Sequence, residues 1–190
     1  MRPFLKWAGG KYRLVELIKS TLPEGNRLIE PFVGSGAVFL SVNYPTNLLA
    51  DANPDLINLF QLIQKEGQGF ISYCQGLFVQ ENNVESAFYK LREEFNATDD
   101  LRKKAALFVY LNRHCFNGLC RYNSKGGFNV PFGRYSKPTL PEKEMLYFHE
   151  KSKYAVSRWL ISQQQWKKQN QVMLYIAVRR MFLYQQLLAL

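Results

Sequence analysis

Two short segments of the chain carry residue types that suit binding of a nucleoside-containing cofactor. Gly34 and Gly36 follow the short apolar stretch 27–30, and Asp51 follows the apolar stretch 47–50. Glycine has no Cβ, so its backbone can approach a ligand closely. A carboxylate at the end of a strand can accept hydrogen bonds from ribose hydroxyls. The pair therefore favours a nucleoside cofactor, although an ordinary strand-to-helix turn gives the same short pattern.

These residues require particular elements to hold them. The stretches 27–30 and 47–50 are predicted to be buried strands, and residues 37–40 begin a helical pattern between them. Such a strand–helix–strand order is typical of an α/β fold with parallel strands. Asp51 is expected at the end of the second of these strands. Asp55 is expected to be an exposed acid at a helix start.

Four motifs occur in a distinctive order. They are residues 4–11, 31–36, 50–56 and 111–135. In this order they resemble the Dam-type (class D12) adenine-specific DNA N6-methyltransferases, which use S-adenosyl-L-methionine. The resemblance covers roughly residues 3–156, and the four motifs together are more specific than any one of them.

The resemblance implies a cofactor site. Its predicted members are Trp7, Lys11, Phe32, Gly34, Gly36 and Asp51. Trp7 and Lys11 would border the methionine end of the cofactor, where Lys11 would pair with its carboxylate, and Asp51 would bind the ribose. The alternative is a core tryptophan and a solvated lysine. No metal site is indicated.

The resemblance also implies double-stranded DNA as the partner, with GATC as the expected target. The predicted contact residues are Lys6, Arg113, Asn117, Leu119, Arg121, Asn123 and Arg134. Lysine, arginine and asparagine are the types that read guanine and adenine edges. Leu119 or Phe116 would serve as an apolar wedge in the base stack, and Arg134 would contact phosphate. The alternative is a glycine-rich surface loop with scattered charge.

Methylation of an adenine amino group needs a flipped base and acceptors for the charge that develops on its nitrogen. The resembled family supplies these with an Asp-Pro-Pro-Tyr motif. The 190 residues contain no Pro-Pro pair, so the catalytic residues cannot be assigned.

We divide the chain into three segments. Residues 1–56 are predicted to be the first part of a Rossmann-like methyltransferase domain that is incomplete at its C-terminal side. Residues 57–145 are predicted to be a mainly helical target-recognition insertion. Within residues 56–63, and again within residues 88–95, apolar residues recur at helical spacing. Residues 105–112 are predicted to form an apolar helix. Residues 117–138 suit a loop or hairpin.

The last segment, 146–190, is predicted to be a remnant or an out-of-frame tail. From residue 157 onward it has seven glutamines and no acid, glycine or proline. Read one base out of register, its codons permit Gly-Pro-Pro-Tyr downstream of Leu174, although aspartate before Pro-Pro is not permitted. The hypothesis is one nucleotide lost near Val156 and Ser157, and the alternative is a genuine basic, glutamine-rich helix.

Composition sets broader limits. The formal net charge is +10, but all 15 acids lie at or before Glu150 and seven of the 25 basic residues lie after it, leaving +3 on residues 1–150. Total charge is therefore weak evidence for DNA binding. Three cysteines without a close pair favour reduced packing residues. No apolar run is long enough to cross a bilayer and no signal peptide is evident, so we expect a cytoplasmic protein. Separately, we expect a monomer.

Two other function classes remain open from sequence. One is a DNA-binding module that keeps residues 57–145 without catalysis, which salt-dependent duplex binding without methyl transfer would favour. The other is an RNA or small-molecule methyltransferase that shares only the cofactor motif. The polar run from Arg113 to Tyr135 argues against the second class.

Overall fold

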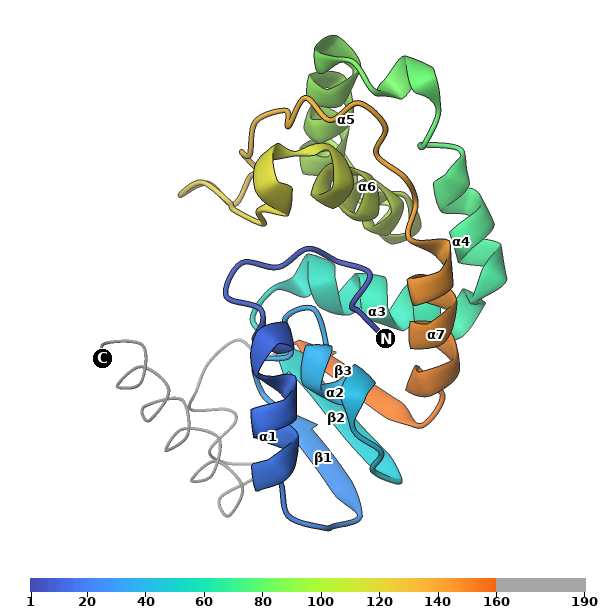
Figure 1. Cartoon of the computed structure of the whole chain (residues 1–190). Helices are drawn as coiled ribbons and strands as arrows, with labels where there is room; N and C mark the ends of the chain where they lie inside the picture. The colour runs from blue at the N-terminus through green and yellow to red at the C-terminus, as the bar shows by residue number, and fades with distance from the viewer. Residues whose placement is uncertain (160–190) are drawn as a thin grey trace, which may run out of the picture.

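A small parallel sheet forms one end of the protein in the computed structural model, which describes residues 1–159 (Figure 1). Its strands are β1 (Arg27–Glu30), β2 (Thr46–Asp51) and β3 (Ala155–Trp159), in the order β1-β2-β3. Both predicted strands are confirmed, and β2 takes one more residue at each end. All pairs are parallel, with Glu30 opposite Leu49 and Asp51 opposite Trp159.

Alternation of side chains along the strands gives the sheet two apolar faces. Leu28, Leu49 and Ala155 face the main core, while Leu48 and Ala50 pack with Ile29 in a smaller cluster. β2 is buried over four consecutive residues because it is the central strand.

Helices make up most of the remaining described chain. Before and between the first two strands lie η1 (Lys11–Leu14), α1 (Val15–Thr21) and α2 (Ala37–Ser41). Between β2 and β3 lie α3 (Pro54–Glu66), α4 (Gln68–Gln75), η2 (Gln80–Asn82), α5 (Glu85–Ala97), α6 (Leu101–His114), η3 (Phe116–Gly118) and α7 (Glu142–Ser152). The fold is thus mixed α/β with a small parallel sheet, as predicted.

Helix α3 connects the sheet to the helical part of the molecule. Its N-cap Asn53 accepts hydrogen bonds from the backbone N–H groups of Asp55 and Leu56, and Pro54 supplies a helix-compatible first residue. The predicted apolar positions from 56 to 63 are buried, and α3 packs on β2 and β3 as well as on α6. Figure 1 shows α3 between the sheet and α4–α6.

Aromatic residues from distant parts of the sequence meet beside α3. The Phe148 ring of α7 lies 4.5 Å from Phe60 and 5.4 Å from Phe4, centroid to centroid. Phe39 of α2 is 5.8 Å from the same ring. This buried group fixes the N-terminal segment and α7 against α2 and α3, since aromatic pairs add about 0.5–1.5 kcal/mol each beyond their buried area.

The loop segment, which we define as residues 115–140, has little regular structure. It contains η3 and two isolated antiparallel bridges, Cys115 with Phe132 and Tyr122 with Phe128. The prediction of a loop or hairpin is confirmed. The loop segment follows α6, which is capped by Asp100 and largely buried from Ala105 onward. Arg113 of α6 also donates to the Thr139 carbonyl near the far end of the loop segment.

Side-chain amides of α3 anchor the third strand. Gln61 donates to the carbonyl of Ser157 at 3.0 Å, and Gln64 donates to that of Ala155 at 2.8 Å. β3 therefore includes residues 157–159 of the proposed out-of-frame tail, and residues 160–190 of that tail lie outside the described residues. The predicted segment boundaries after residues 56 and 145 fall inside α3 and α7.

Other sequence expectations concern single residue types. All three cysteines are free, and Cys74 and Cys115 are buried in the core, as expected of packing residues. His114 is buried and stacks on Tyr110, and burial lowers its pKa to about 4. Within residues 1–159, no helix is long and apolar enough to cross a membrane.

The α3–α4 junction generates a stability prediction. Gly67 has a φ of +51°, and a Cβ there would lie 2.7 Å from Nε2 of His149. Gly67→Ala should lower the free energy of unfolding by about 2 kcal/mol or more, because it adds strain and a collision. Denaturant unfolding of the full chain measures this.

Gly69 provides the matched control. It lies in α4, and no atom stands within 4 Å of the position that a Cβ would take there. Gly69→Ala should be neutral or stabilise by up to about 1 kcal/mol through helix propensity. Equal destabilisation by both substitutions would contradict the role given to Gly67.

Candidate functional site

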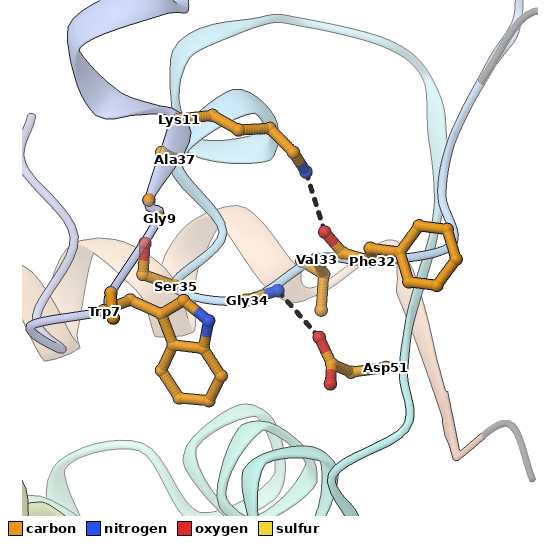
Figure 2. A pocket seen from close by; sticks show the side chains of 11 residues that line it. Trp7, Gly9, Lys11, Phe32, Val33, Gly34, Ser35, Ala37 and Asp51 are labelled. Atoms are coloured by element: carbon orange, nitrogen blue, oxygen red, sulfur yellow. Dashed lines mark hydrogen bonds between the residues drawn. The ribbon is translucent and has the colours of Figure 1, made fainter. Parts of the chain in front are cut away.

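A pocket lies at the carboxyl ends of β1 and β2, beside the N-terminal turn (Figure 2). Its lining residues are Trp7, Ala8, Gly9, Gly10, Lys11, Phe32, Val33, Gly34, Ser35, Ala37 and Asp51. Five of the six residues predicted for the cofactor site are thus brought together. The sixth, Gly36, does not line the pocket and instead precedes α2 with a φ of +75°.

The Trp7 indole lies so close to the backbone of residue 34 that only glycine fits there. Gly34 has a φ of +52°, and a Cβ on it would stand 2.9 Å from Nε1 of Trp7. The turn is held against the sheet by the Val33 N–H, which donates to the Ala50 carbonyl at 2.9 Å. Figure 2 shows Gly34 between the Trp7 indole and the Asp51 carboxylate.

The Asp51 carboxylate joins the turns that follow the first two strands. Its Oδ2 accepts from the Gly34 N–H at 2.9 Å, and its Oδ1 accepts from the Asn53 N–H at 3.0 Å. Each carboxylate oxygen has a further lone pair that can accept a ligand hydroxyl. The sequence predicted the location of Asp51 but not this bridging role.

A buried acid that the sequence analysis missed supports the same pocket. Glu30 accepts from the Phe39 N–H at 2.9 Å and lies 3.4 Å from the Lys11 ammonium. Lys11 also donates to the Phe32 carbonyl at 2.7 Å. The available signal was an acid inside a short apolar strand, which must find partners when buried.

Polar contacts also bring the N-terminal segment to the loop segment. The buried Asn112 amide accepts from the Lys6 N–H at 2.9 Å and donates to the carbonyls of Lys6 at 2.8 Å and Gly118 at 3.1 Å. The Lys6 ammonium lies 4.3 Å from the Tyr135 ring centroid. Lys6 is therefore next to the 117–119 turn, 106 positions before Asn112. Sequence reasoning did not single out Asn112.

Several residues predicted for DNA contact also hold the loop segment together. Arg113 is half-buried and donates to the Thr139 carbonyl at 3.2 Å, and burial lowers its pKa. Arg121 is exposed and donates to Asn129 Oδ1 at 2.8 Å. Asn123 Oδ1 accepts from two backbone N–H groups of its own turn. Some of the predicted polar groups thus have internal partners.

The other predicted members differ in exposure. Arg134 is exposed, has a φ of +52° and lies 3.7 Å from Glu85. Asn117 has a φ of +54°, and its N–H donates to the Tyr135 hydroxyl at 3.0 Å. Leu119 is half-buried against the core, whereas Phe116 is 51% exposed. Of the two predicted wedge residues, Phe116 presents more of its surface.

Asp55 lies at a helix start as expected, but the expectation that it is exposed is wrong. Its side chain is 16% exposed rather than solvated, and Oδ2 accepts a hydrogen bond from the Tyr122 hydroxyl at 2.7 Å. A residue 67 positions later covers it, which helix-end reasoning could not anticipate. Within residues 1–159, no group of three His, Cys, Asp or Glu side chains is arranged to hold a metal ion.

Glu30 generates a prediction about pH. Burial raises the pKa of Glu30 from 4.5, and Lys11 and the Phe39 N–H oppose this only in part. The folded state then binds the proton more tightly than the unfolded state, so ionisation lowers stability as pH rises. Glu30→Gln should gain stability relative to the wild type as pH rises above the ordinary pKa of 4.5, until the folded protein is fully ionised at Glu30.

Glu150 gives a control of opposite sign. The hydrogen bond from Lys153 lowers the pKa of Glu150, which is exposed. Its charge contributes stability above its ordinary pKa, so Glu150→Gln should lose stability relative to the wild type as pH rises. Urea unfolding at several pH values measures both, and the same pH trend for both variants would contradict the assignment for Glu30.

Comparisons with known proteins agree with the sequence motifs. The family model for D12 class N6 adenine-specific DNA methyltransferases matches residues 7–184. A DNA adenine methylase of Serratia marcescens is 55% identical over 154 residues, which are 81% of this chain and 57% of that protein. Those of Vibrio cholerae and Escherichia coli K12 are 53% and 51% identical over the same share of this chain.

The chain spans little more than half the length of these relatives, from 55% to 57%. The matched family range nevertheless covers all of the pocket residues and the whole loop segment. On this match, the chain belongs to the D12 class of N6 adenine-specific DNA methyltransferases.

Proposed function

We propose that this chain binds S-adenosyl-L-methionine in the pocket around Gly34 and Asp51 and binds duplex DNA through Lys6 and the loop segment. The reaction of its family is methyl transfer to the N6 atom of adenine, and the proposed target of binding is GATC. The observation that carries the proposal is Asp51, whose carboxylate lies beside a close-approach glycine at the carboxyl edge of a parallel sheet.

The pocket supports a division of roles for the cofactor. The free lone pairs of Asp51 suit the ribose hydroxyls, and the backbone at Gly34 permits close approach. An ammonium has three donor hydrogens, and Lys11 uses two of them on Glu30 and Phe32. The third is available to the cofactor carboxylate, while Trp7 and Phe32 provide apolar walls.

The sheet and the helices support the proposed organisation. β1, the glycine turn and β2 correspond to the nucleotide-binding part of a Rossmann-like domain. The helical insertion between β2 and β3 carries the loop segment proposed for target recognition. We retain the order of the predicted segments but propose boundaries at the ends of α3 and α7, because domain boundaries avoid helix interiors.

The loop segment supports DNA binding through complementary residue types. Arg121 and Asn123 lie on exposed positions of one hairpin, and Lys6 reaches another part of the loop segment, at Tyr135. Arginine, lysine and asparagine suit guanine and adenine edges in the major groove. Phe116 is the better placed wedge for the stack from which the adenine is flipped. Arg134 is proposed as a phosphate contact.

The 190-residue chain contains no Asp-Pro-Pro-Tyr, so we propose that it binds cofactor and DNA with weak or no methyl transfer. A non-catalytic DNA-binding role is the second candidate, and this sequence feature is what favours it. Efficient transfer of labelled methyl groups to a GATC duplex would contradict both statements.

Cofactor binding is tested at the ribose. The wild type should bind S-adenosylhomocysteine about tenfold or more tightly than its 2′-deoxy analogue, as expected for a hydrogen bond to a charged group. Asp51→Asn should reduce that ratio toward one in titration calorimetry. An unchanged ratio, in a variant with wild-type far-UV circular dichroism, would contradict the assignment of Asp51.

Duplex binding is tested with a matched pair of arginines. Arg121→Ala should reduce the preference for a GATC duplex over a scrambled duplex by about tenfold, as expected for a lost base contact. Arg134→Ala should weaken both duplexes alike and lower the salt dependence. Fluorescence anisotropy at several salt concentrations measures both, and identical effects of the two variants would contradict this division.

A further inference from the structure

The hydroxyl of Tyr122 connects the loop segment to the start of α3. The Tyr122 hydroxyl donates to Asp55 Oδ2 at 2.7 Å, across 67 positions of sequence. The Asp55 side chain is 16% exposed, and within residues 1–159 Lys104 forms an ion pair with it, with Nζ 3.9 Å from Oδ1. A hydrogen bond to an ionised acceptor is about twice as strong as a neutral one. The hydrogen bond from Tyr122 is shorter than the ion pair with Lys104.

The hairpin that carries Tyr122, residues 121–129, is held at its second strand by α5. The Asn96 side chain accepts from the Phe128 N–H at 2.8 Å and donates to the Phe128 carbonyl at 3.1 Å. The hairpin also has internal hydrogen bonds, including those from the Asn123 N–H to the Gly127 carbonyl and from the Asn129 N–H to the Arg121 carbonyl. In its first strand, Tyr122 bonds the start of α3. Two-stranded hairpins are marginal alone in water. Packing of Tyr122 edge-on against Phe128 holds the ring, and burial raises the pKa of Tyr122, which keeps its hydroxyl protonated as a donor.

The neighbours of Tyr122 give this contact a functional consequence. Arg121 and Asn123, which flank it, are exposed. A shift of Tyr122 would move both flanking side chains together, because adjacent residues share the same peptide units. The position of Tyr122 therefore affects two of the proposed base-reading positions at once.

The start of α3 also contacts the cofactor pocket. Asn53 Oδ1 accepts from the Asp55 N–H at 3.0 Å, and the Asn53 N–H donates to Asp51. The Asn53 amide also donates to Cys120 Sγ at 3.4 Å. The loop segment, at Cys120 just before the hairpin, is thus hydrogen-bonded to the same turn that presents the Asp51 carboxylate.

We propose that Tyr122 is a positioning residue, whose hydrogen bond to Asp55 holds the 121–129 hairpin at a fixed place relative to the cofactor pocket and thereby sets discrimination between DNA sequences. This inference rests on the proposed function for its DNA readout. It assigns to Tyr122 no contact with DNA or cofactor.

The test compares two tyrosine-to-phenylalanine variants of the full chain. Tyr110 of α6 is the matched control. Its hydroxyl also donates to an oxygen, the carbonyl of Asn82 at 2.6 Å, and not to Asp55. Tyr122→Phe should speed amide hydrogen exchange by about tenfold in residues 121–129, and Tyr110→Phe should not. Tyr122→Phe should also reduce the preference for a GATC duplex by roughly fivefold with an unchanged salt slope.

A second variant keeps the test decisive if one substitution impairs folding. Asp55→Asn removes the charged acceptor and should give a smaller effect in the same direction. The double variant should lose no more discrimination than Tyr122→Phe alone, since interacting partners are non-additive. Additive losses would overturn the inference.

Two results separate this inference from the proposed function. Equal exchange in the Tyr122 and Tyr110 variants, or an equal loss of duplex preference, would overturn the positioning role. Absence of duplex binding by the wild type contradicts the proposed function instead. The exchange comparison needs no ligand and then still decides whether Tyr122 holds the hairpin.

Discussion

The arrangement of the site depends on the Asp51 carboxylate, which ends the central strand and bonds backbone N–H groups on both sides. One oxygen accepts from Gly34, in the turn after β1, and the other accepts from Asn53, at the start of α3. Charge-assisted bonds to backbone donors are short and strong, so one side chain sets two turns that the sheet alone would leave independent. Gly34 is then held against the Trp7 indole, and α3 begins from a fixed point.

Buried acidic side chains help to define the pocket, because each needs partners from other parts of the chain. Glu30 is buried beneath the glycine turn, and an unpaired carboxylate there would cost several kcal/mol. It is compensated by the Phe39 N–H at the start of α2 and by Lys11, which comes from the N-terminal turn. The same requirement at Asp55 recruits Tyr122 from the loop segment. Each acid thus draws a distant part of the chain to the carboxyl edge of the sheet, where apolar packing alone would be less specific.

The sequence predicted local elements well and long-range polar partners poorly. The periodicity of Leu56 to Ile63 identified α3, and two apolar stretches located β1 and β2, because these patterns depend on neighbours in sequence. Five pocket residues followed from motif order. The pairs Glu30–Lys11, Asp55–Tyr122 and Asn112–Lys6 were missed, because each joins residues that no local pattern relates. The internal partners of Arg113 and Arg121 were missed as well, since both donate to carbonyls of the loop segment.

Consecutive residues at the N-terminus connect the two halves of the candidate site. The backbone of Lys6 is bound on both its N–H and its carbonyl by the buried Asn112 amide, which also holds the Gly118 carbonyl. Trp7, the next residue, lies against Gly34 in the pocket. A trans peptide is planar and fixes the Cα separation of its two residues at about 3.8 Å. Displacement of the 117–119 turn would therefore move the wall of the pocket, unless three hydrogen bonds of Asn112 break. The contact between α6 and the N-terminal segment thus makes the 117–119 turn and the pocket beside Gly34 parts of one mechanical unit, although more than a hundred residues separate Lys6 from Asn112 in sequence.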